Sequence, residues 1–149
     1  HVVDDRPEFA NKERFPSAES VIVADYAEGI KQLDIRPNTS IVVATRGHRE
    51  DDRALEAAVR SPAGYVGLVG SKRKTILIYE ELLKNDIPLE RLAAVHAPVG
   101  LDIGAKTPEE IAVSIMGEIV AFREGRSGKT LAMESRYLKK IATKVGVAV

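Results

Sequence analysis

The stretch GYVGLVGSKRK at residues 64–74 decides the fold that we expect. It opens with a short apolar run rich in valine and glycine, which is typical of a buried parallel strand. The chain then turns at Gly70 and Ser71 into a segment whose apolar residues have helical spacing. The residues with this spacing, on one side of the predicted helix, are Ile76, Tyr79 and Leu83.

The first turn of that predicted helix carries an unusual charge pattern. Ser71 is expected to cap the helix by accepting a hydrogen bond from a free backbone N–H. Lys72, Arg73 and Lys74 follow it, although the helix dipole is already positive there and disfavours each exposed cation by about 0.3–1 kcal/mol. The pattern has two readings. It is either a solvated basic helix start or an anion site, because free N–H groups at a helix N-terminus bind phosphate.

Length and composition limit the class of protein. The 149 residues fit one domain with a real core, and the 22 basic residues balance the 22 acidic ones. We therefore expect neither a nucleic acid nor a membrane as a partner. The sequence has no cysteine, which excludes disulfides and thiolate metal sites within it and suits the cytoplasmic location that we expect. No apolar run approaches the roughly 20 residues of a membrane span.

Strand-like segments alternate with helical patterns along the chain. This alternation predicts an α/β fold of three layers, with an open, mostly parallel sheet and helices on both faces. A capping box precedes the predicted helix at 107–124, whose wide apolar stripe predicts that it is covered on two sides. Residues 1–128 are predicted to form the domain, and 129–149 a C-terminal helical tail. The predicted strands are 1–4, 21–24, 40–44 and 64–69.

Polar clusters follow three of these predicted strands. Ligands bind beyond the carboxyl ends of the strands in open parallel sheets. Three clusters at equivalent ends would converge on one crevice, which favours the anion-site reading of the basic helix start. The clusters are Asp4, Asp5 and Arg6; Thr45, Arg46, Gly47 and His48; and Gly70, Ser71, Lys72 and Arg73.

Several of the polar residues have a structural reading beside a functional one. Asp4 stands where a dinucleotide-binding fold places the acid that binds ribose hydroxyls, but an aspartate at a strand end also caps a turn. His48 and His96 lack a second ligand at metal spacing, so we interpret them as hydrogen-bonding loop residues. Asp102 lies in a glycine-rich loop and either forms an Asx turn or serves function. We predict no catalytic residue and no metal site.

Four blocks of this sequence, in this order, resemble the C-terminal Rossmann-like domain of the XdhC/CoxI family. Together they are highly specific, and the resemblance covers about residues 1–128. The blocks are VVDDRPEF at 2–9, TRGH at 45–48, GLVGSKRK at 67–74, and HAPVGLDIGA at 96–105 with TPEEIA at 107–112.

The resemblance implies an accessory factor for a molybdenum hydroxylase of the xanthine dehydrogenase type, rather than an enzyme. Such a factor binds molybdenum cofactor (molybdopterin), protects it during sulfuration and delivers it to the apo-enzyme. The implied partners are the apo-hydroxylase and a cysteine desulfurase. We assign cofactor binding to the three strand-end clusters and to four residues of the later loop: His96, Gly100, Asp102 and Gly104.

The sequence departs from the family pattern in two respects. Family members typically have an N-terminal domain with a Gly-Gly-Cys motif, and a first strand with a Gly-Ala-Gly-His turn just before the position of Val2. The 149 residues contain neither. We therefore expect a sheet with an uncovered edge, or an edge filled by another chain or by the tail. Since unpaired edges promote association, we also expect a homodimer or a swapped element.

Two alternative functions follow from the same residues. One is an NAD(P)-dependent oxidoreductase of Rossmann type, which requires a glycine-rich turn upstream and offers His48 as its candidate proton donor. The other is an interaction module in which the helix at 107–124 forms a dimer or client interface.

Overall fold

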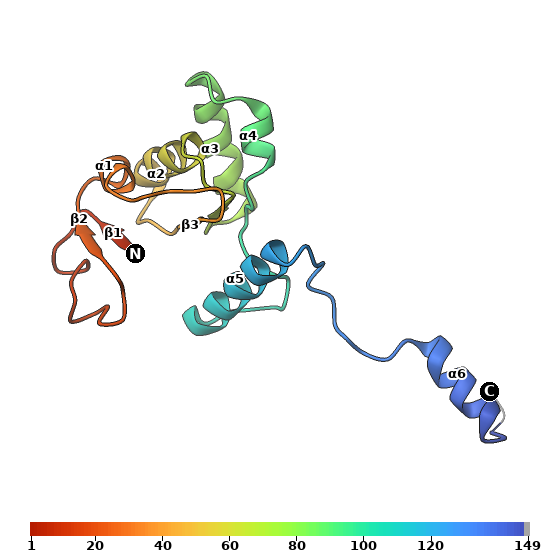
Figure 1. The fold of residues 1–149 in the computed structure, drawn as a ribbon. Helices are drawn as coiled ribbons and strands as arrows, with labels where there is room; N and C mark the ends of the chain where they lie inside the picture. The colour runs from red at the N-terminus through yellow and green to blue at the C-terminus, as the bar shows by residue number, and fades with distance from the viewer. Residues whose placement is uncertain (148–149) are drawn as a thin grey trace.

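The computed structural model describes residues 1–147, without the side chains of residues 48 and 49. Figure 1 shows α1, α2 and α3 on one side of the strands and α5 on the other, so the α/β layering predicted from the sequence is confirmed. The elements are β1 (Val2–Asp4), β2 (Val21–Val23), α1 (Tyr26–Lys31), β3 (Ser40–Val43), α2 (His48–Arg60), β4 (Tyr65–Leu68), α3 (Lys72–Lys84), α4 (Leu89–Ala93), α5 (Pro108–Arg123) and α6 (Ser135–Lys144).

The strands pair in parallel, as expected, but in two sheets. β1 pairs with β2, with Val3 opposite Ile22. β3 pairs with β4, with Val42 opposite Gly67, and His96 adds an isolated parallel bridge to Gly67. The prediction of one continuous sheet is therefore wrong for the described residues, because none of them pairs with both β1 and β3. Helices join the two sheets, through contacts of α1 with β1, of α2 with β3 and β4, and of α1 with α2.

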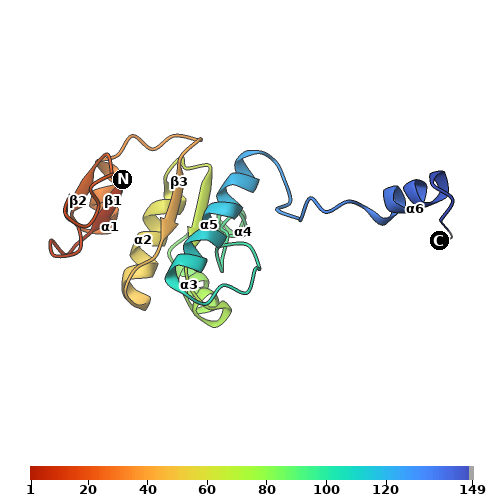
Figure 2. The same cartoon turned by 90° about the horizontal axis from the view of Figure 1, so that it is seen from below.

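A cavity of about 470 Å³ separates the two sheets and is lined from both sides by β1 and β3. Figure 2 shows β1 and β2 standing apart from β3 and β4. Val2, Val3, Ile41 and Val42 line it, and Tyr26 of α1 also contributes to its wall. The cavity is thus a mostly apolar slot between two strand edges, and it is the uncovered edge expected from the sequence.

The backbone of both strands also faces this slot. On β1, the N–H of Val2 donates to Ser20 and the carbonyl of Asp4 accepts from Ala24, so these residues face β2. Alternate residues of a strand bond in opposite directions, so the peptide groups of Val3 point toward the slot. On β3, the carbonyl of Val43 accepts from the N–H of Val69, just past β4, so Val43 faces β4. The peptide groups of the neighbouring Val42 therefore point toward the slot.

The core lies between the helix layer and β4. Leu55 of α2, Leu68 of β4 and Leu82 of α3 have no exposed surface. The apolar spacing that predicted α3 does not mark its buried face, since Ile76 and Leu83 are 58% and 45% exposed. The buried residues of α3 are instead Thr75, Ile78 and Leu82.

A hydrogen bond explains why α3 buries a threonine. The hydroxyl of Thr75 donates to the carbonyl of Ser71 at 3.1 Å, so its polar group is satisfied inside the protein. The set 75, 78 and 82 has helical spacing like the predicted set, and only tertiary packing against α2 distinguishes the two faces.

The predicted capping box begins α5. The Thr107 side chain accepts from the N–H of Glu110, and the Glu110 carboxylate accepts from the N–H of Thr107. The prediction that α5 is covered on two sides is wrong within residues 1–147. One side packs toward β4, whereas Val113, Met116 and Val120 are 65%, 57% and 42% exposed.

Among residues 1–147, no helix is long and apolar enough to cross a bilayer.

The slot between the sheets generates a prediction about association. We expect the chain to self-associate through its unpaired β1 and β3 edges, since such edges pair with other chains. Val42→Lys places a charge in the slot and should shift the chain toward monomer in gel filtration with light scattering. The matched change Val113→Lys, on the exposed side of α5, should leave association unchanged. The opposite pattern would assign the interface to α5.

Candidate functional site

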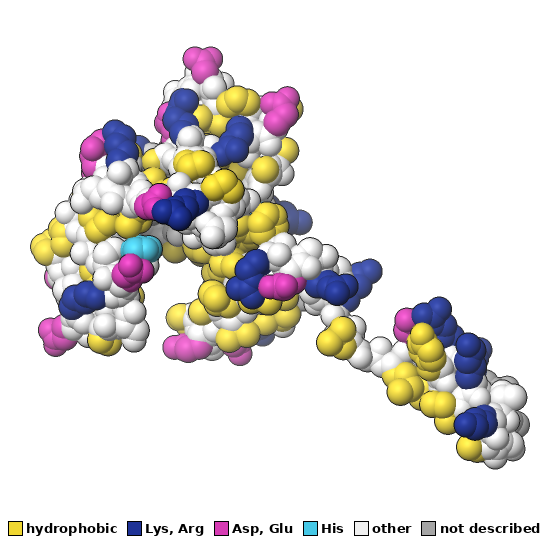
Figure 3. All heavy atoms as spheres, viewed as in Figure 1, with side chains coloured by type: hydrophobic (Ala, Val, Ile, Leu, Met, Phe, Trp, Pro, Cys, Tyr) yellow, Lys and Arg dark blue, Asp and Glu magenta, His cyan; other side chains and the backbone are white. Residues whose placement is uncertain are grey.

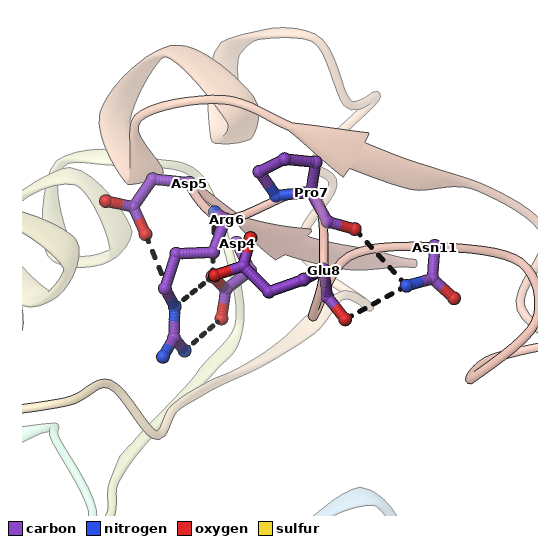
Figure 4. A network of polar contacts seen from close by, with 6 residues as sticks. All are labelled: Asp4, Asp5, Arg6, Pro7, Glu8 and Asn11. Carbon is purple, nitrogen blue, oxygen red and sulfur yellow. Dashed lines mark hydrogen bonds and ion pairs between the residues drawn. The ribbon is translucent and has the colours of Figure 1, made fainter.

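The first strand end is organised by Arg6 (Figure 4). Its Nε and Nη2 donate to the two carboxylate oxygens of Asp4, each at 2.8 Å, and its backbone N–H donates to the same carboxylate at 3.0 Å. Hydrogen bonding from Arg6 holds the pKa of Asp4 below its ordinary value. The guanidinium also lies 3.8 Å from Asp5 and 3.9 Å from the ring centroid of Phe9. Arg6 is therefore an internal partner of the two acids, and Asp5 remains about half exposed.

A second arrangement joins three elements through Asp51, which lies in the first turn of α2 and has no exposed surface. The Thr45 hydroxyl, just past β3, donates to one carboxylate oxygen at 2.5 Å. The Lys74 ammonium of α3 forms an ion pair with the other oxygen. Lys74 is consequently neutralised, and only two of the three cations at the start of α3 face solvent.

The N-terminus of α3 is where the sequence predicts an anion site. The Ser71 side chain accepts from the N–H of Lys74 at 3.3 Å, which confirms the predicted cap. The side chains of Lys72 and Arg73 are exposed. Their N–H groups belong to the first turn, where an α-helix offers no partner of its own. Two backbone donors and two cations thus stand together at the end of β4.

A third cluster lies between β4 and α5. The Glu118 carboxylate accepts from the Tyr65 hydroxyl at 2.7 Å and from the N–H of Gly100 at 2.8 Å, and it lies 3.2 Å from His96 Nδ1. The His96 ring stacks on Tyr65 at 4.4 Å between centroids, and Phe122 meets both rings edge-on. Glu118 therefore fastens the glycine-rich loop and β4 to α5.

The ionisation of this cluster follows from its contacts. Burial raises the pKa of Glu118, but hydrogen bonds from Tyr65, Gly100 and His96 outweigh it and hold the pKa below its ordinary value. Burial and the bond to the carboxylate both raise the pKa of the Tyr65 phenol. Tyr65 is thus a neutral donor to an ionised acceptor, which suits a structural bond better than proton transfer.

The structure divides the predicted site residues into two groups. Asp4 and Thr45 line the same slot, and Thr45 is connected through Asp51 to the start of α3. Loop residues 96–104 instead have contacts with β4 and α5: His96 and Gly100 bind Glu118, while Asp102 and Gly104 are exposed. Arg46 and Gly47 are exposed before α2, and the side chain of His48 lies outside the described residues.

Sequence reasoning missed Asp51 and Glu118 as organising residues. In the sequence, Asp51 and Asp52 are acids near the start of a predicted helix, where the helix dipole alone favours an acid without requiring burial. Glu118 had a stronger signal, since it is a lone carboxylate in the otherwise apolar run between Ile115 and Phe122. A charge in such a position is expected to have a partner. Among the described residues, no group of three or more His, Asp or Glu side chains could hold a metal ion.

The sequence of this chain is similar to a family model and to known proteins. The family model described as the XdhC Rossmann domain matches residues 1–119. An uncharacterized protein, YqeB of Escherichia coli K12, is 35% identical over 128 residues, which are 85% of this chain and 23% of that protein. A probable xanthine dehydrogenase subunit of Bacillus subtilis is 33% identical over 123 residues, which are 83% of this chain and 35% of that protein.

A solved structure agrees with these matches. The crystal structure of a xanthine dehydrogenase from Bacillus halodurans superposes with a TM-score of 0.70 at 32% identity, covering 83% of this chain and 36% of that one. The chain spans between about a quarter and a third of the length of these relatives.

The buried ion pair generates a prediction about stability. Lys74→Met leaves the Asp51 carboxylate buried without its cation, so we expect a loss of roughly 3–5 kcal/mol in the free energy of unfolding. Lys72→Met removes a neighbouring exposed cation and should change it by no more than about 0.5 kcal/mol. Urea unfolding measures both. Equal effects would show that the pair does not organise the site.

The lowered pKa of Glu118 generates a prediction about pH. A group with a lowered pKa in the folded state stabilises it above the unfolded value of 4.5, and this contribution disappears as the pH falls through the folded pKa. Glu118→Gln should therefore cost roughly 1.5–3 kcal/mol at neutral pH, and the difference from wild type should shrink below about pH 4.5. Glu124→Gln, at a surface pair, is the control. A difference that stays constant with pH would contradict the assignment.

Proposed function

We propose a function from one premise: the chain belongs to the XdhC Rossmann domain family. Its relatives include proteins named for xanthine dehydrogenase. We propose that the protein serves in the maturation of a molybdenum hydroxylase of this type. In this role it binds molybdenum cofactor and delivers it to the apo-enzyme.

The observation that carries the binding step is the start of α3. Lys72 and Arg73 are exposed there, beside the Ser71 cap, whereas Lys74 is already paired with Asp51. Two exposed cations against a positive helix end are unfavourable until an anion arrives. The phosphate of the pterin is such an anion, and it would accept hydrogen bonds from the N–H groups and the guanidinium together.

The acids at the end of β1 suit the other end of the ligand. Asp5 is about half exposed, and Arg6 keeps Asp4 ionised, so both present hydrogen-bond acceptors. A pterin carries N–H donors that such oxygens accept. Bound cofactor supplies the molybdenum chemistry of the hydroxylase, and the residues of this chain bind and orient it.

Binding of phosphate-bearing molybdopterin to the purified chain tests the proposal. Arg73→Ala should weaken binding about tenfold, a change of about 1.4 kcal/mol. The melting temperature should stay unchanged or rise slightly, because a repulsion with the helix dipole is removed. Lys84→Ala, an exposed lysine at the other end of α3, is the matched control and should bind like wild type.

Two outcomes would overturn the proposal. If Arg73→Ala unfolds the chain, its side chain is structural. If the chain instead binds NAD(P)H tightly and turns it over with a carbonyl or quinone acceptor, the oxidoreductase alternative is correct. Transfer is measured separately, as the activity recovered by an apo-hydroxylase mixed with the loaded protein.

A further inference from the structure

The C-terminal helix α6 stands clear of the rest of the molecule in Figures 1 and 2. Residues 126–134, which connect it to α5, have no regular secondary structure. None of the residues of α6 is buried. The helix therefore has one free apolar side and one free polar side.

The apolar side of α6 is continuous. Tyr137, Leu138, Ile141 and Val145 are 46%, 55%, 50% and 66% exposed, and their spacing places them on one face of the helix. The preceding segment extends this face, because Leu131 is fully exposed and Met133 is 61% exposed. Figure 3 shows these hydrophobic side chains along one side of α6.

The opposite side of α6 carries almost only positive charge. Arg136 and Lys139 lie on it, Lys140 and Lys144 flank the apolar stripe beside Tyr137, and Glu134, the one acid between residues 129 and 147, pairs with Arg136. Because the whole chain has no net charge, the preceding residues carry an excess of acids. The zero net charge, from which we expected no membrane partner, is therefore unevenly distributed, with a cationic segment at residues 129–147.

We propose that α6 binds the surface of a membrane containing anionic phospholipid. A short helix with an apolar face and a lysine-rich face lies in the boundary between headgroups and acyl chains, with its apolar side inserted. The four cations then meet a continuous anionic layer. The helix binds at the surface and does not span the bilayer, in keeping with its length of 10 residues.

A second copy of the chain fits α6 less well. The exposed stripe of α5 offers apolar side chains, including Val113 and Met116, while the first turn of α5 carries two acids, Glu109 and Glu110, and its last turn one base, Arg123. Docked there, the four cations of α6 would meet Glu109 and Arg123, because the Glu110 carboxylate already accepts hydrogen bonds in the capping box. The charge of the helix therefore favours lipid over this protein surface.

Co-sedimentation of the full 149-residue chain with vesicles tests the proposal. We expect binding to vesicles of equal parts phosphatidylcholine and phosphatidylglycerol, and none to phosphatidylcholine alone. Binding should fall as salt screens the charges. Lys139→Gln with Lys140→Gln should reduce partitioning at least tenfold. Leu138→Ser with Ile141→Ser should abolish it.

A matched control separates α6 from general charge effects. Lys31→Gln with Lys84→Gln removes two exposed lysines from the body of the protein and should leave vesicle binding unchanged. Equal losses in both lysine pairs, or equal binding to neutral vesicles, would overturn the proposal. So would a lack of lipid binding together with a dimer that Leu138→Ser and Ile141→Ser dissociate, because α6 would then dock on a second copy.

Discussion

The arrangement of this protein depends on one buried carboxylate. Asp51 holds the hydroxyl of Thr45, after β3, and the ammonium of Lys74, in α3, so a single side chain fixes a strand end and two helix starts. Removing a charge from water is unfavourable unless partners replace the water, and here both oxygens have one. Lys74 is anchored by its ion pair with Asp51, and this contact also positions the exposed Lys72 and Arg73 beside it.

Local features were predictable from the sequence, and features set by distant contacts were not. Ser71 and Thr107 cap their helices as expected, because capping depends on residues within one turn. The buried face of α3 could not be read from spacing, since both apolar faces have helical spacing and only packing against α2 selects Ile78 and Leu82. The pairing partners of β1 and β3 depend on the whole sheet, so the division into two sheets was not visible in any one segment.

In the candidate site, too, local patterns were predictable from the sequence and contacts between distant residues were not. The strand-end clusters were found because polar residues after apolar runs are a local pattern, and one residue from each of two clusters, Asp4 and Thr45, lines the slot. The role of His96 depends on Glu118, which is 22 positions away in the sequence and has no motif of its own. The glycine-rich loop therefore belongs to the packing of α5 on β4, a relation that only the tertiary structure reveals.

The slot between β1 and β3 also affects how the fold unfolds in part. No described backbone hydrogen-bond ladder joins the two sheets, and the main contacts between them run through α1 and α2. The fully buried leucines all lie on the side of α2, α3, α4 and β4. Amide protons of β1 and β2 should therefore exchange through a partial opening of low free energy, while those of β3 and β4 wait for global unfolding. The N-terminal strand pair should then open as a separate cooperative unit that carries Asp4 and Asp5 with it.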